Sequence, residues 1–159
     1  MGLDNGITCT ITSKEKNFER HYEVCYWRKY WGLRENILVE LDHYGEDCYE
    51  WELDEDDMLS IKDVLEYFCD IEKVKETELS TIWSNEDEVE WIKKQYKQIS
   101  VAFDYLQGKI SLKQFTEALN SWQWGYNLMA WKKEERLWQQ ILESPPDDLE
   151  VVFTFYDSY

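Results

Sequence analysis

Positively charged side chains are scarce in this chain. Only 17 Lys and Arg residues stand against 34 Asp and Glu residues, so the formal net charge is −17. Nucleic acids and anionic membrane surfaces attract proteins through positive patches, so the charge argues against direct binding to either. Three uses of the negative charge remain open: solubility, attraction of a basic partner, and imitation of the phosphate backbone.

Membrane-length apolar runs, leader patterns and paired cysteines are also missing. No apolar run approaches the roughly 18 residues of a membrane-spanning helix. The opening residues "MGLDNGITCT" have neither the charged nor the apolar region of a secretory signal. The four cysteines show no CxxC spacing, which favours free thiols in a reducing compartment over disulfides. We therefore expect a cytoplasmic protein.

Aromatic residues, by contrast, are abundant. The chain has nine Trp and eleven Tyr residues, and 43% of its 159 residues are apolar. A chain of this length and composition can bury a core without disulfides or metals. Trp and Tyr serve both cores and protein interfaces, because each joins a large apolar body to a polar group. We expect one domain over residues 1–159, with residues 108–148 as a helical insertion.

Three segments have the pattern of β-strands. "GITCTITS" near the start and "LEVVFTFYDSY" at the end are rich in β-branched and aromatic residues. "CYEWEL" alternates, which places Cys48, Glu50 and Glu52 on one side of a strand and Tyr49, Trp51 and Leu53 on the other. Strands at both ends of the chain suggest that the two ends pair in one sheet.

Helices are predicted from end signals and apolar spacing. Asp54 is a good N-cap for a helix whose buried stripe is Met58, Ile61, Leu65 and Phe68. Further helix starts are indicated at Asn85 with Glu88 and at Ser111 with Gln114. Gly108 ends the helix between them. A last helix, with Trp124, Trp131 and Trp138 on one stripe, runs toward Pro145 and Pro146.

The segment from His21 to Leu38 is ambiguous. "HYEVCYW" alternates as a strand does, yet Val24, Trp27 and Trp31 also fit helical spacing. We favour a helix from about Trp27 to Leu38. The predicted fold is α+β: a small, mostly antiparallel sheet that includes both terminal strands and is covered by four to five helices.

No motif for catalysis or metal binding stands out. His21, Cys25, His43 and Cys48 offer zinc-ligand types without the paired short spacings of a structural site. "DEDD" lacks the ligand spacing of a calcium loop, and the chain has neither a P-loop nor a nucleophile elbow. We therefore expect no metal and no cofactor, and a binding protein rather than an enzyme.

A polar cluster is a candidate ligand site. Its members come from the chain start and from a rare basic segment: Asp4, Asn5, Tyr26, Trp27, Arg28 and Lys29. In one reading, Asp4 and Arg28 fix a nucleotide-type small ligand. In the other, Arg28 and Lys29 balance neighbouring acids while Tyr26 and Trp27 pack.

The order of several short motifs resembles a family of bacteriophage and prophage proteins with no established activity. The opening "MGLD" and "YWRK" at residues 26–29 resemble its typical motifs, and "WSNEDEVEW" and "FTFYDSY" follow in the matching order. The likeness covers roughly residues 1–106 and 149–159. "DNG" and "KYWGLRENIL" depart from the pattern, so ligand roles of those residues do not carry over. The resemblance implies a phage source, and with it a location in the host cell cytoplasm, but no particular reaction.

The strongest functional candidate is the acidic stretch between Glu35 and Ile61, which has eleven acidic residues and no Lys or Arg. Helix capping and the helix dipole account for Asp54–Asp57. A strand face needs only polarity, so the acids before Asp54 remain unexplained. The candidate partner-binding residues are Glu46, Asp47, Glu50, Glu52, Asp54 and Asp56.

From these residues we predict an acidic phage accessory protein of anti-defence type. It would inhibit a basic host protein, such as a defence nuclease or another nucleic-acid-binding protein, by presenting a DNA-mimicking surface. The alternative is the small-ligand protein with its pocket near Asp4 and Arg28.

Overall fold

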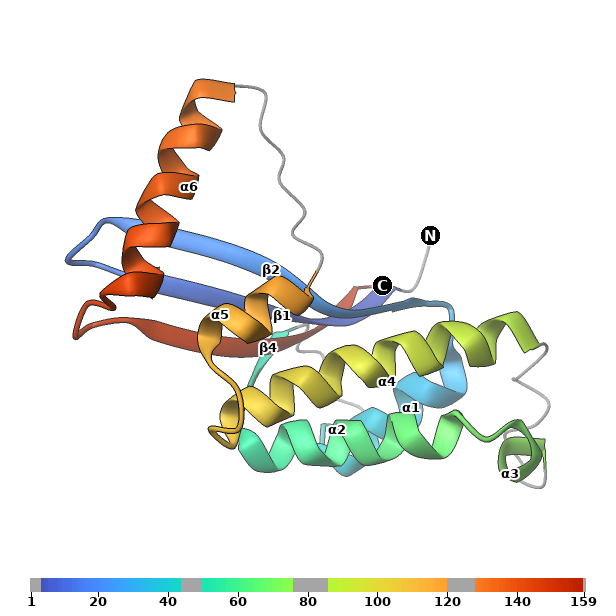
Figure 1. The fold of residues 1–159 in the computed structure, drawn as a ribbon. Coiled ribbons are helices and arrows are strands. Elements are labelled where there is room, and N and C mark those ends of the chain that lie inside the picture. Colours follow the sequence, from blue (N-terminus) through green and yellow to red (C-terminus); the bar gives the residue numbers. More distant parts are fainter. Residues whose placement is uncertain (1–3, 44–49, 76–85, 120–127, 159) are drawn as a thin grey trace.

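A computed structural model describes residues 4–43, 50–75, 86–119 and 128–158 of the chain (Figure 1). Its elements are β1 (Asp4–Ser13), β2 (Phe18–Arg28), α1 (Trp31–Glu40), β3 (Glu50–Leu53), α2 (Glu55–Phe68), α3 (Ile71–Lys75), α4 (Glu86–Leu106), α5 (Leu112–Ala118), α6 (Leu128–Glu143) and β4 (Glu150–Ser158).

The four strands form one antiparallel sheet in the order β2-β1-β4-β3. The strands from the two ends of the chain, β1 and β4, are neighbours at its centre, and β2 and β3 are its edges. Together with the helices, this confirms the predicted α+β class and the predicted pairing of the terminal strands.

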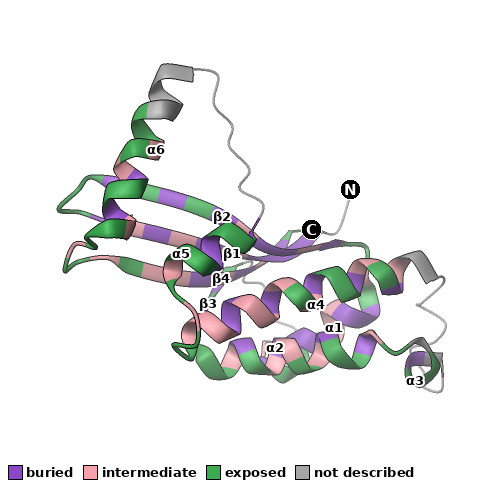
Figure 2. Cartoon of the chain, viewed as in Figure 1, coloured by how far each residue is buried: buried purple, intermediate pink, exposed green. Residues whose placement is uncertain are grey.

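One face of the sheet, here called the inner face, carries the hydrophobic core. Buried and more exposed residues alternate along the strands (Figure 2). Ile7, Phe155 and Trp51 occupy neighbouring positions across three strands and are all buried. Phe153 packs near Phe115 of α5, with ring centroids 5.8 Å apart. The inner face therefore anchors the helical layer.

The start and the buried stripe of α2 are as predicted. The Asp54 side chain accepts a hydrogen bond from the main-chain N–H of Asp57, and Asp57 reciprocates in a capping box. Met58, Ile61, Leu65 and Phe68 are buried. Trp51 and Leu53 are buried on β3 while Glu50 and Glu52 are exposed, as the alternation predicted.

Two further helix signals are confirmed. Gly108 follows α4 with a φ of 73°, the left-handed conformation that glycine adopts most easily. Ser111 and Gln114 form a reciprocal capping box at the start of α5. The predicted cap at Asn85 lies outside the described residues.

The predicted helix from Trp27 to Leu38 is wrong at its start. β2 continues to Arg28, Lys29 turns the chain with a φ of 61°, and α1 begins at Trp31. The cause is a bulge: Cys25 lies opposite Ile7 and Glu23 opposite Thr8, which leaves Val24 without a partner in the register. Val24 and Cys25 are consecutive and both buried, so the simple alternation is interrupted.

α6 packs against β2 through Trp138. The Trp138 ring stacks on Phe18 with centroids 5.6 Å apart, and the Arg20 guanidinium lies 5.2 Å from the Trp138 ring centroid. Arg20 also bridges to Glu135 at 2.8 Å. The other two members of the predicted Trp stripe, Trp124 and Trp131, have side chains outside the described set.

Candidate functional site

The outer face of the sheet is the face opposite the core. Its residues follow from the strand register, and each column runs along one strand. They are Glu19, His21, Glu23, Tyr26 and Arg28 on β2; Asp4, Gly6, Thr8, Thr10 and Thr12 on β1; Glu150, Val152, Thr154 and Tyr156 on β4; and Glu50 and Glu52 on β3.

Hydroxyl groups fill the centre of this face and carboxylates mark its margins. One row across the four strands reads Glu23, Thr8, Thr154 and Glu52. Neighbouring strands lie about 4.8 Å apart, so the carboxylate-bearing columns of β2 and β3 are roughly 14 Å apart. The outer face is therefore a polar strip with carboxylates on both of its margins.

The marginal carboxylates reach solvent to different degrees. Glu50 and Glu52 are exposed on β3, and the Glu19 side chain on β2 is 64% exposed. Glu23 is half-buried, and that burial raises the pKa of its carboxyl group. Glu150 adds a further exposed carboxylate at the start of β4.

The predicted partner-binding acids fall into three groups. Glu50 and Glu52 lie on the outer face as one exposed pair. Asp54 and Asp56 are exposed at the start of α2, where Asp54 is held as the N-cap. Glu46 and Asp47 lie outside the described residues. The structure thus brings Glu50 and Glu52 together, and it gives Asp54 a structural role as the N-cap of α2.

The alternation of the strands divides the predicted ligand cluster. Asp4, Tyr26 and Arg28 belong to the outer face and contact one another. The Tyr26 hydroxyl donates to Asp4 at 2.9 Å, and the Arg28 Nε lies 3.4 Å from the same carboxylate oxygen. These contacts compensate the Asp4 charge within the protein. Lys29 is exposed in the turn that follows β2.

Asn5 and Trp27 lie on the inner face and are fully buried. The Asn5 side-chain amide donates to Asp157, and Arg34 of α1 binds the same carboxylate through two hydrogen bonds of 2.8 and 2.7 Å. Trp27 packs near Phe155, with ring centroids 6.2 Å apart. Asn5 therefore helps to join α1 to the sheet, whereas Trp27 belongs to the core, and neither lies on the face that carries Asp4 and Arg28.

Tyr156 covers Gly6, which lies near the start of β1 on the outer face. A Cβ added to Gly6 would lie 2.7 Å from the Tyr156 hydroxyl oxygen and 2.3 Å from the main-chain oxygen of Cys25. Burial raises the pKa of the Tyr156 hydroxyl, and the negative charges of Glu23 and Asp4 add to the effect. The hydroxyl therefore stays protonated at physiological pH.

The zinc-ligand types considered from the sequence are not gathered by the described structure. His21 is exposed on β2, whereas Cys25 lies buried beyond the bulge. Cys48 falls outside the described residues. Within the described ranges, no cluster of three or more His, Cys, Asp or Glu side chains is arranged to hold a metal ion. No helix in those ranges is both long and apolar enough to span a membrane.

Comparison with known proteins found no match among models of protein families, curated proteins or solved structures. The functional argument therefore starts from the outer face itself.

Sequence reasoning missed the acids that β2 and β4 add to the outer face. Glu19 and Glu23 alternate with the buried Arg20 and Tyr22 in "FERHYE", which is the signal of a half-buried strand. Their position opposite the β3 pair depends on the strand order β2-β1-β4-β3. That order is a long-range property that the local pattern does not contain.

Proposed function

We propose that this protein binds a basic protein partner through the outer face of its sheet and thereby competes with nucleic acid for that partner. The single observation that carries the proposal is the pair of exposed carboxylates on β3, Glu50 and Glu52, on the same face as the acids of β2. The overall charge of −17 gives the partner a long-range attraction.

The spacing of the carboxylates suits a surface that normally meets phosphates. Alternate residues on a strand lie about 6.6 Å apart, so Glu50 and Glu52 present two charges at that separation. The acidic columns on β2 and β3 are roughly 14 Å apart, which is close to the width of about 12 Å of a DNA major groove. A basic groove-binding surface could therefore contact both columns at once.

The partner class follows from charge and from the resemblance to phage proteins. A host nuclease or another nucleic-acid-binding protein carries the basic surface that this face requires. An accessory protein that covers such a surface would inhibit its partner without any chemistry of its own. The binding should be fast and sensitive to salt, because steering by charge weakens as ionic strength rises.

The test compares two variants of equal charge. The first neutralises the β3 side of the outer face with Glu50→Gln, Glu52→Gln and Glu150→Gln. The matched control neutralises three exposed acids on helices, Glu66→Gln, Glu117→Gln and Glu143→Gln. Each immobilised protein captures partners from a bacterial lysate, and the captured proteins are then challenged with duplex DNA.

We expect the wild type and the helix variant to retain the same partners and to release them to DNA, while the outer-face variant retains few. Equal retention by both variants would show that only total charge matters and would refute the proposed face. Partners that DNA does not displace would refute the competition with nucleic acid.

The small-ligand alternative has weaker support. Its central pair, Asp4 and Arg28, is already engaged within the protein, and Asn5 and Trp27 lie on the opposite face. Thermal unfolding in a panel of nucleotides tests it, since a ligand at saturating concentration raises the unfolding temperature. A clear rise with one nucleotide would restore this alternative.

A further inference from the structure

The edge strand β2 has two unlike halves. Near its end, α4 takes the place of a neighbouring strand. The side-chain oxygen of Gln95 accepts from the Tyr26 N–H at 2.8 Å, and the Trp91 indole N–H donates to the Tyr26 carbonyl at 2.7 Å. The main-chain groups of Tyr26 therefore point away from β1.

The outward direction also applies to the residues of β2 that lie opposite every second residue of β1. Tyr26 lies opposite Gly6 of β1, so Gly6 directs its own main-chain groups toward β4. Thr8, Thr10 and Thr12 follow Gly6 at steps of two and do the same. Their partners on β2, which are Glu23, His21 and Glu19, consequently direct their N–H and C=O groups outward.

In the part of the chain that the structure describes, this first half of β2 is an open edge. Among the residues that the structure describes, no segment hydrogen-bonds to the outward main-chain groups of Glu19, His21 and Glu23. Glu19 and His21 are also well exposed, with 64% and 62% of their side chains accessible. Unpaired N–H and C=O groups in a row are a template for an additional strand.

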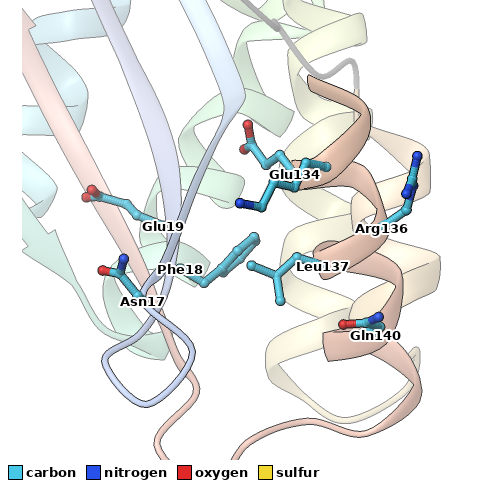
Figure 3. A pocket seen from close by; sticks show the side chains of 8 residues that line it. Asn17, Phe18, Glu19, Glu134, Arg136, Leu137 and Gln140 are labelled. Carbon is cyan, nitrogen blue, oxygen red and sulfur yellow. The ribbon is translucent and has the colours of Figure 1, made fainter. Parts of the chain in front are cut away.

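A groove lies beside this open edge. It has a volume of about 580 Å³ and separates the β1–β2 hairpin from α6. Phe18 of β2 and Leu137 of α6 point toward each other across it (Figure 3). Its other lining residues are Asn17, Glu19, Lys133, Glu134, Arg136 and Gln140. An open strand edge next to a helix with an apolar groove between them is a geometry that accepts an extended peptide.

The acidic side chains beside this edge determine which kind of strand can pair with it. A second copy of this chain, paired antiparallel about His21, would place Glu19 opposite the Glu23 of the other copy twice. Like charges directly opposite each other destabilise a strand pair, and each copy carries a charge of −17. A strand with Lys or Arg at those positions would instead form opposite-charge pairs with Glu19 and Glu23.

We propose that the open half of β2 receives an extended segment of a basic protein partner, in which Lys or Arg alternates with apolar residues. Basic side chains opposite Glu19 and Glu23 would lie on the outer face. The intervening apolar side chains would enter the groove against Phe18 and Leu137. The proposal rests on the proposed function for the basic nature of the partner and adds how that partner is held.

The probe is a capped seven-residue peptide of alternating Lys and Val. Two control peptides use the same residues: one groups the Lys residues at one end, and one is N-methylated at the Lys amides, which would face Glu19, His21 and Glu23 in an antiparallel pair. Titration into ¹⁵N-labelled protein is followed by amide chemical shifts and by hydrogen exchange. We expect the alternating peptide to shift and to protect the amides of Glu19, His21 and Glu23 and to bind at least several-fold more tightly than both controls.

His21→Pro is the decisive variant, with His21→Ala as its control. Proline removes the outward N–H of residue 21 and leaves the pairing with β1 in place, because that N–H does not point toward β1. Circular dichroism verifies the fold of both variants. We expect His21→Pro to bind the alternating peptide roughly tenfold more weakly than His21→Ala, as loss of one main-chain hydrogen bond implies.

The outcomes separate this inference from the proposed function. Equal binding of the alternating peptide by His21→Pro and His21→Ala overturns strand addition, as does equal binding of the N-methylated peptide. If His21→Pro also keeps the lysate partners that the Glu50, Glu52 and Glu150 variant loses, the outer face stands and only the strand addition fails. If the peptide protects the β2 amides while the Glu50, Glu52 and Glu150 variant keeps its lysate partners, strand addition stands and binding through the outer face fails.

Discussion

The side-chain oxygen of Gln95 accepts a hydrogen bond of 2.8 Å from the main-chain N–H of Tyr26, across a sequence separation of 69 residues. One turn earlier on the same helix, Trp91 donates to the Tyr26 carbonyl at 2.7 Å. Two side chains of α4 thus satisfy both outward main-chain groups of one residue on an edge strand. Gln95 is buried, so neither group of this pair has water as an easy substitute.

Replacement of Gln95 by Leu should therefore destabilise the fold. The change leaves the Tyr26 N–H buried without a partner, which costs about 1–3 kcal/mol in the free energy of unfolding. Urea denaturation measures the effect. Gln98→Leu, on the more exposed side of the same helix, is the matched control and should change stability by less than about 0.5 kcal/mol. Equal losses in the two variants would contradict the role given to Gln95.

Gly6→Ala should be among the most damaging small substitutions in the chain. The new Cβ would lie 2.3 Å from the main-chain oxygen of Cys25, and this oxygen belongs to a paired strand that cannot move freely. Overpacking of this kind costs typically about 1–3 kcal/mol and occasionally more. Gly108→Ala is the comparison: its surroundings are open and only its φ of 73° opposes the change, so its loss should be about 1 kcal/mol. Thermal unfolding ranks the two, and a larger loss for Gly108→Ala would refute the crowding at Gly6.

How far the sequence predicts this fold is clearest from two neighbouring segments. In α2, the cap at Asp54 and the stripe that begins at Met58 are local signals, and the structure has both. In β2, the bulge at Val24 breaks the alternation and puts Val24 and Trp27 into the core three residues apart. That is also a helical spacing, so a local pattern predicted the wrong element.

The candidate site was predicted only in part for a similar reason. Glu50 and Glu52 could be assigned to an exposed strand face, because alternation is a local property. That Asp4 and Asn5 lie on opposite faces is also a local property, since consecutive residues of a strand face opposite ways. It could be predicted only with a strand that begins at residue 4, as β1 does. The open edge of β2 depends on the strand order and on the hydrogen bond between Gln95 and Tyr26. Neither can be predicted from a short stretch of the sequence.

The buried ion pair between Arg34 and Asp157 should couple α1 to the sheet. Arg34→Met leaves the Asp157 carboxylate, whose side chain is 5% exposed, without its guanidinium partner. Breaking a buried pair in this way costs roughly 3–5 kcal/mol. The double variant with Asp157→Asn should lose clearly less than the sum of the single losses, because it leaves no unpaired charge. Urea denaturation of the four proteins measures the coupling, and additive losses would mean that the pair contributes nothing specific.

Asp148 should make the stability of the β1–β2 hairpin depend on pH. Its carboxylate accepts hydrogen bonds from the Glu15 N–H at 2.9 Å and from the Ser13 hydroxyl at 2.7 Å, and these bonds lower its pKa below the ordinary value of 3.8. A lowered folded-state pKa gives stability that is present above pH 3.8 and is lost as pH falls through the folded value. The stability difference between wild type and Asp148→Asn should therefore shrink on acidification. Asp147→Asn, at an exposed neighbour, is the control, and a difference that persists in strong acid would contradict the assignment.

Burial of Cys9 should protect its thiol and tie stability to alkaline pH. Burial raises the pKa of Cys9 from 9.0 to about 12, and it also raises the pKa of Cys25. Because the thiolate is the reactive form, iodoacetamide should modify the more accessible Cys69 first and should reach Cys9 and Cys25 only on unfolding. A Cys48→Ser background keeps the comparison to these three thiols. The stability that comes from the neutral Cys9 thiol is complete below pH 9 and is lost as pH rises toward about 12, so unfolding should become easier over that range. Rapid modification of Cys9 in the folded protein at pH 8, followed by mass spectrometry of its peptide, would contradict this placement.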